Sequence, residues 1–160
     1  MTDKKTTTED VASPDLSATV IWREEPAKHD YPAAANYLGL LADGDTVSYI
    51  VDQLQKAPIV QYRANDLLRA ARLELLPLDD AGVKNDLRKM ILGTALSPVL
   101  IVRGDMLHDY PLTIADGYHR ICASYHLSEK TYIPCRVVDL PVKEKVTPAP
   151  KADDDAASKS

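Results

Sequence analysis

One short run in the last third of the chain combines a glycine turn with two basic side chains. The run is Leu-Thr-Ile-Ala-Asp-Gly-Tyr-His-Arg, residues 112–120. A strand-like segment ends at Asp116 and Gly117, and a helical pattern begins at Tyr118. A helix N-terminus carries free backbone N–H groups and partial positive charge. Arg120 adds a planar set of donors that suits phosphate. The run therefore predicts an anion site, with nucleotide phosphates as the expected ligand.

Asp116 has two possible roles in such a site. Its negative charge would repel phosphates unless it caps the helix or holds a metal ion. Asp is a common N-cap residue, and Mg²⁺ is typically bound by one or two carboxylates together with phosphate oxygens. The alternative interpretation of the whole run is an ordinary helix start, with Asp116 as the cap and basic side chains in solvent.

Two cysteines and two histidines form a second constellation. His119, Cys122 and His126 are spaced i, i+3 and i+7 on one face of the expected helix, and Cys135 follows later. These residue types suit zinc, but the paired close spacing of common zinc sites is missing. Cysteine is among the most buried residue types. We therefore expect no metal site, and we expect Cys122 and Cys135 to be small core residues.

Composition limits the class of protein. The 160 residues carry a net charge of −5, and residues 26–142 hold twelve basic and fourteen acidic groups. This balance weighs against DNA as a partner, because DNA binding relies on Lys and Arg. The sequence contains no run of about 18 apolar residues, so we expect no membrane span. The polar start resembles no secretion signal and cysteines are few, so we expect a cytoplasmic protein.

The ends of the chain differ from its middle. Residues 1–25 and 143–160 are polar and rich in charge or proline, which predicts disordered tails. Residues 26–142 are expected to form a single domain. Within it, residues 32–74 have a helical pattern, with a second helix capped by Thr46.

Residues 75–141 alternate between helical and strand patterns. The expected order is a helix over 81–92, strands over 98–103 and 112–115 paired as a hairpin, a helix over 118–127, and a strand over 133–138. This order predicts an α/β (α+β) fold, in which helices pack on a small mixed sheet.

Residues 77–139 resemble the ParB/sulfiredoxin superfamily. Members share a helix followed by a strand opened by proline, here Ser97-Pro98-Val99, and a second strand that runs into a glycine turn, here Ile114-Ala115-Asp116-Gly117. A helix that begins with two basic residues follows, here His119-Arg120, and the closing strand carries a proline, here Ile133-Pro134. The resemblance implies a ParB/sulfiredoxin-like core with an extra N-terminal helical segment over 32–74.

In that superfamily the motif binds nucleotide phosphates, ATP in some members and CTP in others. The resemblance implies that the turn lines a phosphate pocket with Gly117, Tyr118, His119 and Arg120. The preceding helix supplies cationic groups in relatives. Lys84 and Arg88 share a face here, whereas Lys89 lies on another, so Lys84 and Arg88 are the expected contacts. ATP or CTP with Mg²⁺ is the expected cofactor.

The chain also departs from the superfamily. Sulfiredoxin has a reactive cysteine before its His-Arg pair, where this chain has Tyr118, so sulfinic-acid reductase activity is not expected. ParB continues into a DNA-binding domain, whereas the residues after Leu140 predict a short disordered tail, so we do not expect this chain alone to act as a partition protein. We therefore expect a nucleotide-binding protein that could hydrolyse NTP or transfer phosphate. The alternative is a non-enzymatic module related to ParB that associates with DNA or with another protein.

Overall fold

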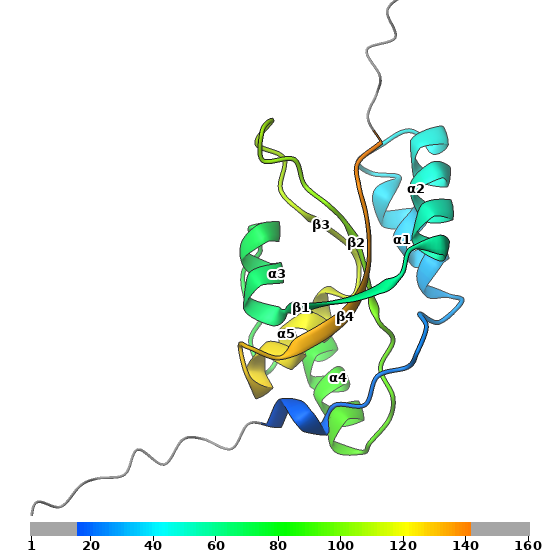
Figure 1. Cartoon of the computed structure of the whole chain (residues 1–160). Helices are drawn as coiled ribbons and strands as arrows, with labels where there is room; N and C mark the ends of the chain where they lie inside the picture. The colour runs from blue at the N-terminus through cyan, green and yellow to red at the C-terminus, as the bar shows by residue number, and fades with distance from the viewer. Residues whose placement is uncertain (1–15, 142–160) are drawn as a thin grey trace, which may run out of the picture.

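Four strands form one mixed sheet in the order β1-β4-β2-β3 (Figure 1). The computed structural model describes residues 16–141. β2 runs parallel to β4, whereas the β1–β4 and β2–β3 pairs are antiparallel. The expected hairpin and the mixed sheet are confirmed. The strands are β1 (Ile59–Arg63), β2 (Val99–Val102), β3 (Thr113–Asp116) and β4 (Tyr132–Val138).

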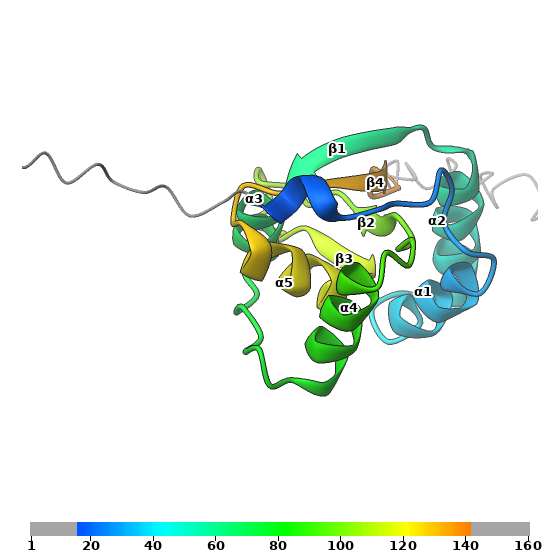
Figure 2. The ribbon, with the colours of Figure 1, turned by 90° about the horizontal axis from the view of Figure 1, so that it is seen from below.

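Five α-helices of the described region cover both faces of the sheet, which makes this an α/β protein (Figure 2). α1 and α2 pack on one face, and α3, α4 and α5 pack on the other. A short 3₁₀ helix, η1, precedes them. The helices are η1 (Leu16–Thr19), α1 (Asp30–Leu38), α2 (Gly44–Lys56), α3 (Ala64–Ala71), α4 (Ala81–Ile91) and α5 (Tyr118–Leu127).

β2 explains why the sheet needs two helical layers. All four of its residues are buried, and successive side chains of a strand point to opposite faces. Val99 and Ile101 join the core under α3, α4 and α5, whereas Leu100 and Val102 join the core under α1 and α2. A strand that is apolar on both sides is stable only when both sides are covered.

The prediction that residues 32–74 are helical is wrong for residues 59–63, which form β1. Pro58 follows α2 and disfavours further helix before it. Ile59 and Val60 are β-branched and Tyr62 is aromatic, which favours a strand. The N-terminal part of the domain therefore supplies an edge strand of the sheet as well as helices.

The boundaries of α2 and α5 test the helix ends that were predicted from the sequence. Asp43 caps α2 by accepting a hydrogen bond from the Thr46 backbone N–H at 2.8 Å, so the prediction that Thr46 is the cap is wrong. α5 spans the expected residues 118–127.

α4 begins and ends where its sequence signals predict. Asp80 caps it by accepting from the Val83 N–H at 3.0 Å. At the other end, Gly93 has a φ of +71° and the Thr94 N–H donates to the Lys89 carbonyl at 2.9 Å. This is the left-handed turn that glycine favours after a helix.

The prediction of a disordered tail over residues 1–25 is wrong for residues 16–25. Trp22 forms a bridge with Leu96, the Arg23 N–H donates to the Leu96 carbonyl at 2.8 Å, and the Leu96 N–H donates to the Ile21 carbonyl at 2.9 Å. The remaining tail predictions, over 1–15 and 143–160, lie outside the described residues. No helix between residues 16 and 141 is long and apolar enough to cross a membrane.

The two thiols are expected to be unreactive in the folded protein. Cys122 and Cys135 are fully buried in the core, as predicted. Burial raises the pKa of both, that of Cys135 to about 12, so little thiolate forms near neutral pH. A disulfide reagent such as DTNB should label neither thiol quickly in native protein, and both once guanidinium chloride unfolds it. Rapid labelling of the native protein would contradict this packing.

Candidate functional site

The turn between β3 and α5 is built on Gly117, which has a φ of +114°. A Cβ at this position would lie 2.8 Å from the Val99 Cβ and closer still to its Cγ1, so the turn packs directly on β2. Gly117 is itself the N-cap of α5, and no side chain caps the helix. The expectation that Asp116 is the cap is therefore wrong.

The start of α5 leaves backbone donors free, as the sequence predicts. Among the described residues, Ile121 supplies the first helical N–H with a backbone acceptor, the Gly117 carbonyl at 3.0 Å. The N–H groups of Tyr118, His119 and Arg120 precede it. Such groups carry the partial positive charge of the helix.

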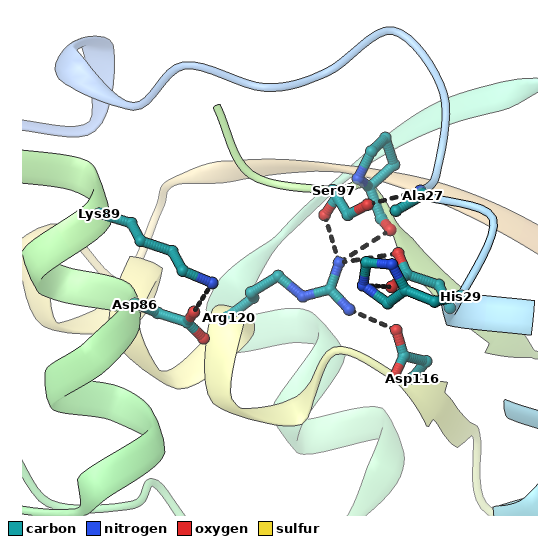
Figure 3. Close-up of polar contacts among 9 residues, drawn as sticks. Ala27, His29, Asp86, Lys89, Ser97, Asp116 and Arg120 are labelled. Carbon is teal, nitrogen blue, oxygen red and sulfur yellow. Dashed lines mark hydrogen bonds and ion pairs between the residues drawn. The ribbon is translucent and has the colours of Figure 1, made fainter. Parts of the chain in front are cut away.

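The Arg120 side chain points back into the protein (Figure 3). Its guanidinium donates to the carbonyls of Ser97 at 2.6 Å and Pro98 at 3.2 Å, and to the Asp116 carboxylate. It also lies 3.6 Å from Asp30 Oδ2. The side chain is only 12% exposed. Arg120 thus ties the glycine turn to the start of β2 and to α1.

Two carboxylates share this one guanidinium. Burial raises the pKa of Asp116, and Arg120 opposes that shift, while the neighbouring charge of Asp30 adds to it. Asp30 Oδ2 is buried with no hydrogen-bond partner in the described part of the chain. Asp30 Oδ1 lies 3.3 Å from Nε2 of the exposed His29. One guanidinium therefore faces two carboxylates, and burial favours the neutral form of Asp116.

A cavity of about 250 Å³ borders this cluster, and Arg120, Asp30 and His29 line it. The N-terminal segment, the end of α4, the residues before β2 and Arg120 surround it. Ala27 and Ser97 join two of these walls, because the Ala27 N–H donates to Ser97 Oγ at 2.7 Å. The charged side chains that line the cavity are Arg23, Lys89, Arg120, His29, Asp30 and Asp86.

α4 presents Lys89, rather than Lys84 or Arg88, to this cavity. The helix packs inward through Val83, Asp86 and Met90, and Lys89 Nζ lies 3.8 Å from Asp86 Oδ1. As expected from the sequence, Lys84 and Lys89 lie on different faces of this helix. However, the face that was expected to contact phosphate, that of Lys84 and Arg88, is exposed and does not line the cavity.

Tyr118 and His119 do not line the cavity either. The Tyr118 hydroxyl donates to the Glu74 carbonyl. His119 Nε2 lies 3.5 Å from Asp80 Oδ1, at the start of α4. The imidazole packs so closely on Gly82 that a Cβ there would lie 2.6 Å from His119 Cγ. Of the four expected motif residues, the structure brings Arg120 alone to the cavity.

Several residues that line the cavity were not predicted from the sequence, because they precede the first expected helix. Arg23 lies in the tail predicted over residues 1–25, and His29 and Asp30 lie in the predicted domain but before its expected helical segment over 32–74. Their positions depend on the backbone pairing of Arg23 with Leu96. The usable signal was Trp22, an aromatic residue inside an otherwise polar segment.

The described region holds no group of three His, Cys, Asp or Glu side chains that could bind a metal ion. His126 uses its Nε2 at 2.7 Å from the Leu76 carbonyl, and Cys122 is buried in the core.

Comparison of the chain with family models, with curated proteins and with solved structures gives no match. What defines the protein is therefore its own α/β architecture, a mixed four-stranded sheet between two helical layers.

Proposed function

We propose that this chain is a ParB/sulfiredoxin-like nucleotide-binding protein, and that it holds nucleotide phosphates in the cavity beside Arg120. The observation that supports this most is the pair of available cations in the cavity wall. In the described region the Arg23 side chain has no ion pair, and Lys89 has only a long one to Asp86. Both cations lie beside the cavity with the arginine of the glycine-turn motif.

The order α4–β2–β3–α5–β4 also supports the resemblance. Pro98 precedes β2, β3 runs into Gly117, and Pro134 lies within β4. Small-molecule pockets are typically about 300–1,000 Å³. A cavity of about 250 Å³ suits the phosphate groups of a nucleotide, with the base outside it.

The basic side chains around the cavity would have different roles toward a phosphate ligand. Arg23 and Lys89 would neutralise phosphate charge through charge-assisted hydrogen bonds. Arg120 acts mainly as a positioning residue, because its guanidinium already holds Asp116 and two carbonyls. Where Mg²⁺ accompanies ATP or CTP, Asp30 and Asp86 are the carboxylates in the cavity wall that would hold it, whereas Asp116 does not line the cavity. Hydrolysis or phosphotransfer at this site would draw on the same cations to stabilise developing charge.

Replacing Lys89 tests the proposal against a matched control on the same helix. Calorimetry with ATP, CTP and inorganic triphosphate, each with Mg²⁺, should show binding by the wild type. Lys89→Gln should weaken it roughly ten-fold, the loss of one charge-assisted contact. Lys84→Gln removes the same charge from the exposed face and should leave affinity unchanged.

Two results would contradict this site. Absence of binding by both nucleotides at millimolar concentration would remove the proposed function. An equal loss in Lys84→Gln and Lys89→Gln would indicate a general charge effect rather than a contact in the cavity. Binding of duplex DNA that falls steeply with salt would favour the ParB-related DNA alternative instead.

A further inference from the structure

A second and larger cavity, of about 780 Å³, lies between α3 and the β2–β3 hairpin. It shares no lining residue with the cavity beside Arg120. Its apolar floor continues from the core and consists of Leu67, Ile101, Leu112 and Val137. Its volume falls in the range of about 300–1,000 Å³ that is typical of small-molecule sites.

The walls of this cavity are fixed by backbone contacts. The Leu112 N–H donates to the Ala70 carbonyl at 3.1 Å and holds the hairpin against α3. The two arms of the hairpin cross tightly at Gly104, where a Cβ would lie 2.7 Å from the Leu112 backbone nitrogen. A cavity bounded in this way exists before a ligand arrives, which lowers the entropic cost of binding.

Three arginines stand at the rim of the apolar floor. Arg69 pairs with Asp66 at 3.1 Å, Arg72 pairs with Asp109, and Arg103 pairs with Asp139 at 2.7 Å. The side chains of all three pairs are more than half exposed. Exposed pairs contribute little stability, so an incoming carboxylate can exchange with Asp66, Asp109 or Asp139 at small cost.

The outer wall of the cavity carries exposed apolar side chains. Met106 is 92% exposed and Tyr110 is 58% exposed, and both line the cavity. Methionine is flexible and polarisable, and it adapts to ligands of different shape. An apolar group placed on the floor would also be covered by these two side chains.

We propose that this cavity binds an amphipathic anion, a small molecule with an apolar chain or ring and a carboxylate head. The apolar part lies on the Leu67–Ile101–Leu112–Val137 floor, and the carboxylate pairs with a guanidinium at the rim. Guanidinium groups bind carboxylates with two parallel hydrogen bonds, which gives the site its preference for charge.

The test uses decanoate as the probe, below its micelle concentration, with the full chain. Calorimetry should show saturable binding of decanoate. Decyltrimethylammonium has the same apolar chain with the opposite charge and should bind at least about ten-fold more weakly, a difference of one charge-assisted pair. Acetate, the head group alone, should show no binding.

Variants locate the binding. Ala70 lines the cavity from an exposed position on α3, so Ala70→Phe should place a ring in the cavity and weaken decanoate binding. The double variant Arg72→Gln/Arg103→Gln should weaken it at least ten-fold and reduce the preference over decyltrimethylammonium. Arg63→Gln is the matched control, because Arg63 is an exposed arginine near Tyr132 that does not line the cavity.

Two outcomes would overturn the proposal. Equal affinity for the anion and the cation would show a general apolar surface. Decanoate binding that is unchanged in both Ala70→Phe and the double arginine variant would place the ligand elsewhere. Lys89→Gln should not affect decanoate, so this test remains separate from that of the nucleotide site.

Discussion

Arg120→Met should lose about 3–4 kcal/mol of unfolding free energy near neutral pH, because it leaves two buried carboxylates without their guanidinium. The substitution keeps an apolar side chain of similar length but removes the only guanidinium that the Asp116 carboxylate contacts among the described residues. Asp30, already buried with an oxygen that has no hydrogen-bond partner, loses its ion pair with Arg120 as well. Chemical denaturation followed by circular dichroism measures the effect.

The loss should depend on pH in a defined direction. Burial already raises the pKa of Asp116, and Arg120 opposes that shift. Without Arg120 the pKa rises further, because the opposing charge is gone. A raised carboxyl pKa in the folded state destabilises the protein above that pKa, and the penalty disappears as the pH falls toward the unfolded value of about 4. The difference between Arg120→Met and the wild type should therefore shrink as the pH is lowered.

Two further variants check the cause. Asp116→Asn combined with Arg120→Met should recover part of the stability at neutral pH and flatten the pH dependence. Lys84→Met removes an exposed charge and should change stability by no more than about 0.5 kcal/mol. A loss in Arg120→Met that stays constant across pH would mean that packing, rather than the unpaired carboxylates, is responsible.

Gly117→Ala should destabilise the protein by about 2–5 kcal/mol, the sum of backbone strain and overpacking. The φ of +114° is unfavourable for any residue with a Cβ, and that Cβ would overlap the side chain of the buried Val99. Thermal unfolding should show a midpoint lower by roughly 10 °C.

Gly44→Ala provides the matched control, because a Cβ at Gly44 meets nothing within 4 Å. Gly44 is the first residue of α2, where alanine is tolerated. Adding Val99→Ala to Gly117→Ala should relieve the clash with Cγ1 only, because the Cβ of residue 99 still lies 2.8 Å from the new Cβ and the backbone strain remains, so recovery should be partial. Equal stability of Gly117→Ala and Gly44→Ala would show that the turn adapts at little cost.

Local signals were sufficient for some elements and insufficient for others. α5 and the β2–β3 hairpin were predicted because the glycine turn, the apolar periodicity and the strand lengths all act over neighbouring residues. β1 was missed because a five-residue segment after Pro58 becomes a strand only by pairing with β4, as in the register of Val60 with Cys135. Ile59, Val60 and Tyr62 favour a strand locally, but they do not specify which strand it pairs with.

The candidate site could likewise be predicted only in part from the sequence. The free N–H groups at the start of α5 followed from the turn sequence. The partners of Arg120 did not, because Ser97 and Asp30 belong to other parts of the chain. Likewise, the periodicity of α4 separates Lys84 from Lys89, but only the packing of Val83, Asp86 and Met90 decides which of them meets the cavity.

The bridge between Trp22 and Leu96 has a consequence for the order of folding. The cavity beside Arg120 needs residues 23–30, the end of α4 and α5 together, and Ala27 and Ser97 are 70 positions apart. Contacts over such separations form late, because closing a long loop costs entropy before any contact compensates it. The β2–β3 hairpin and α5 make local contacts and can assemble before this N-terminal segment docks. Ligand binding at the cavity would thus be acquired late, and it would favour the fully assembled chain over species in which only the hairpin and α5 have formed.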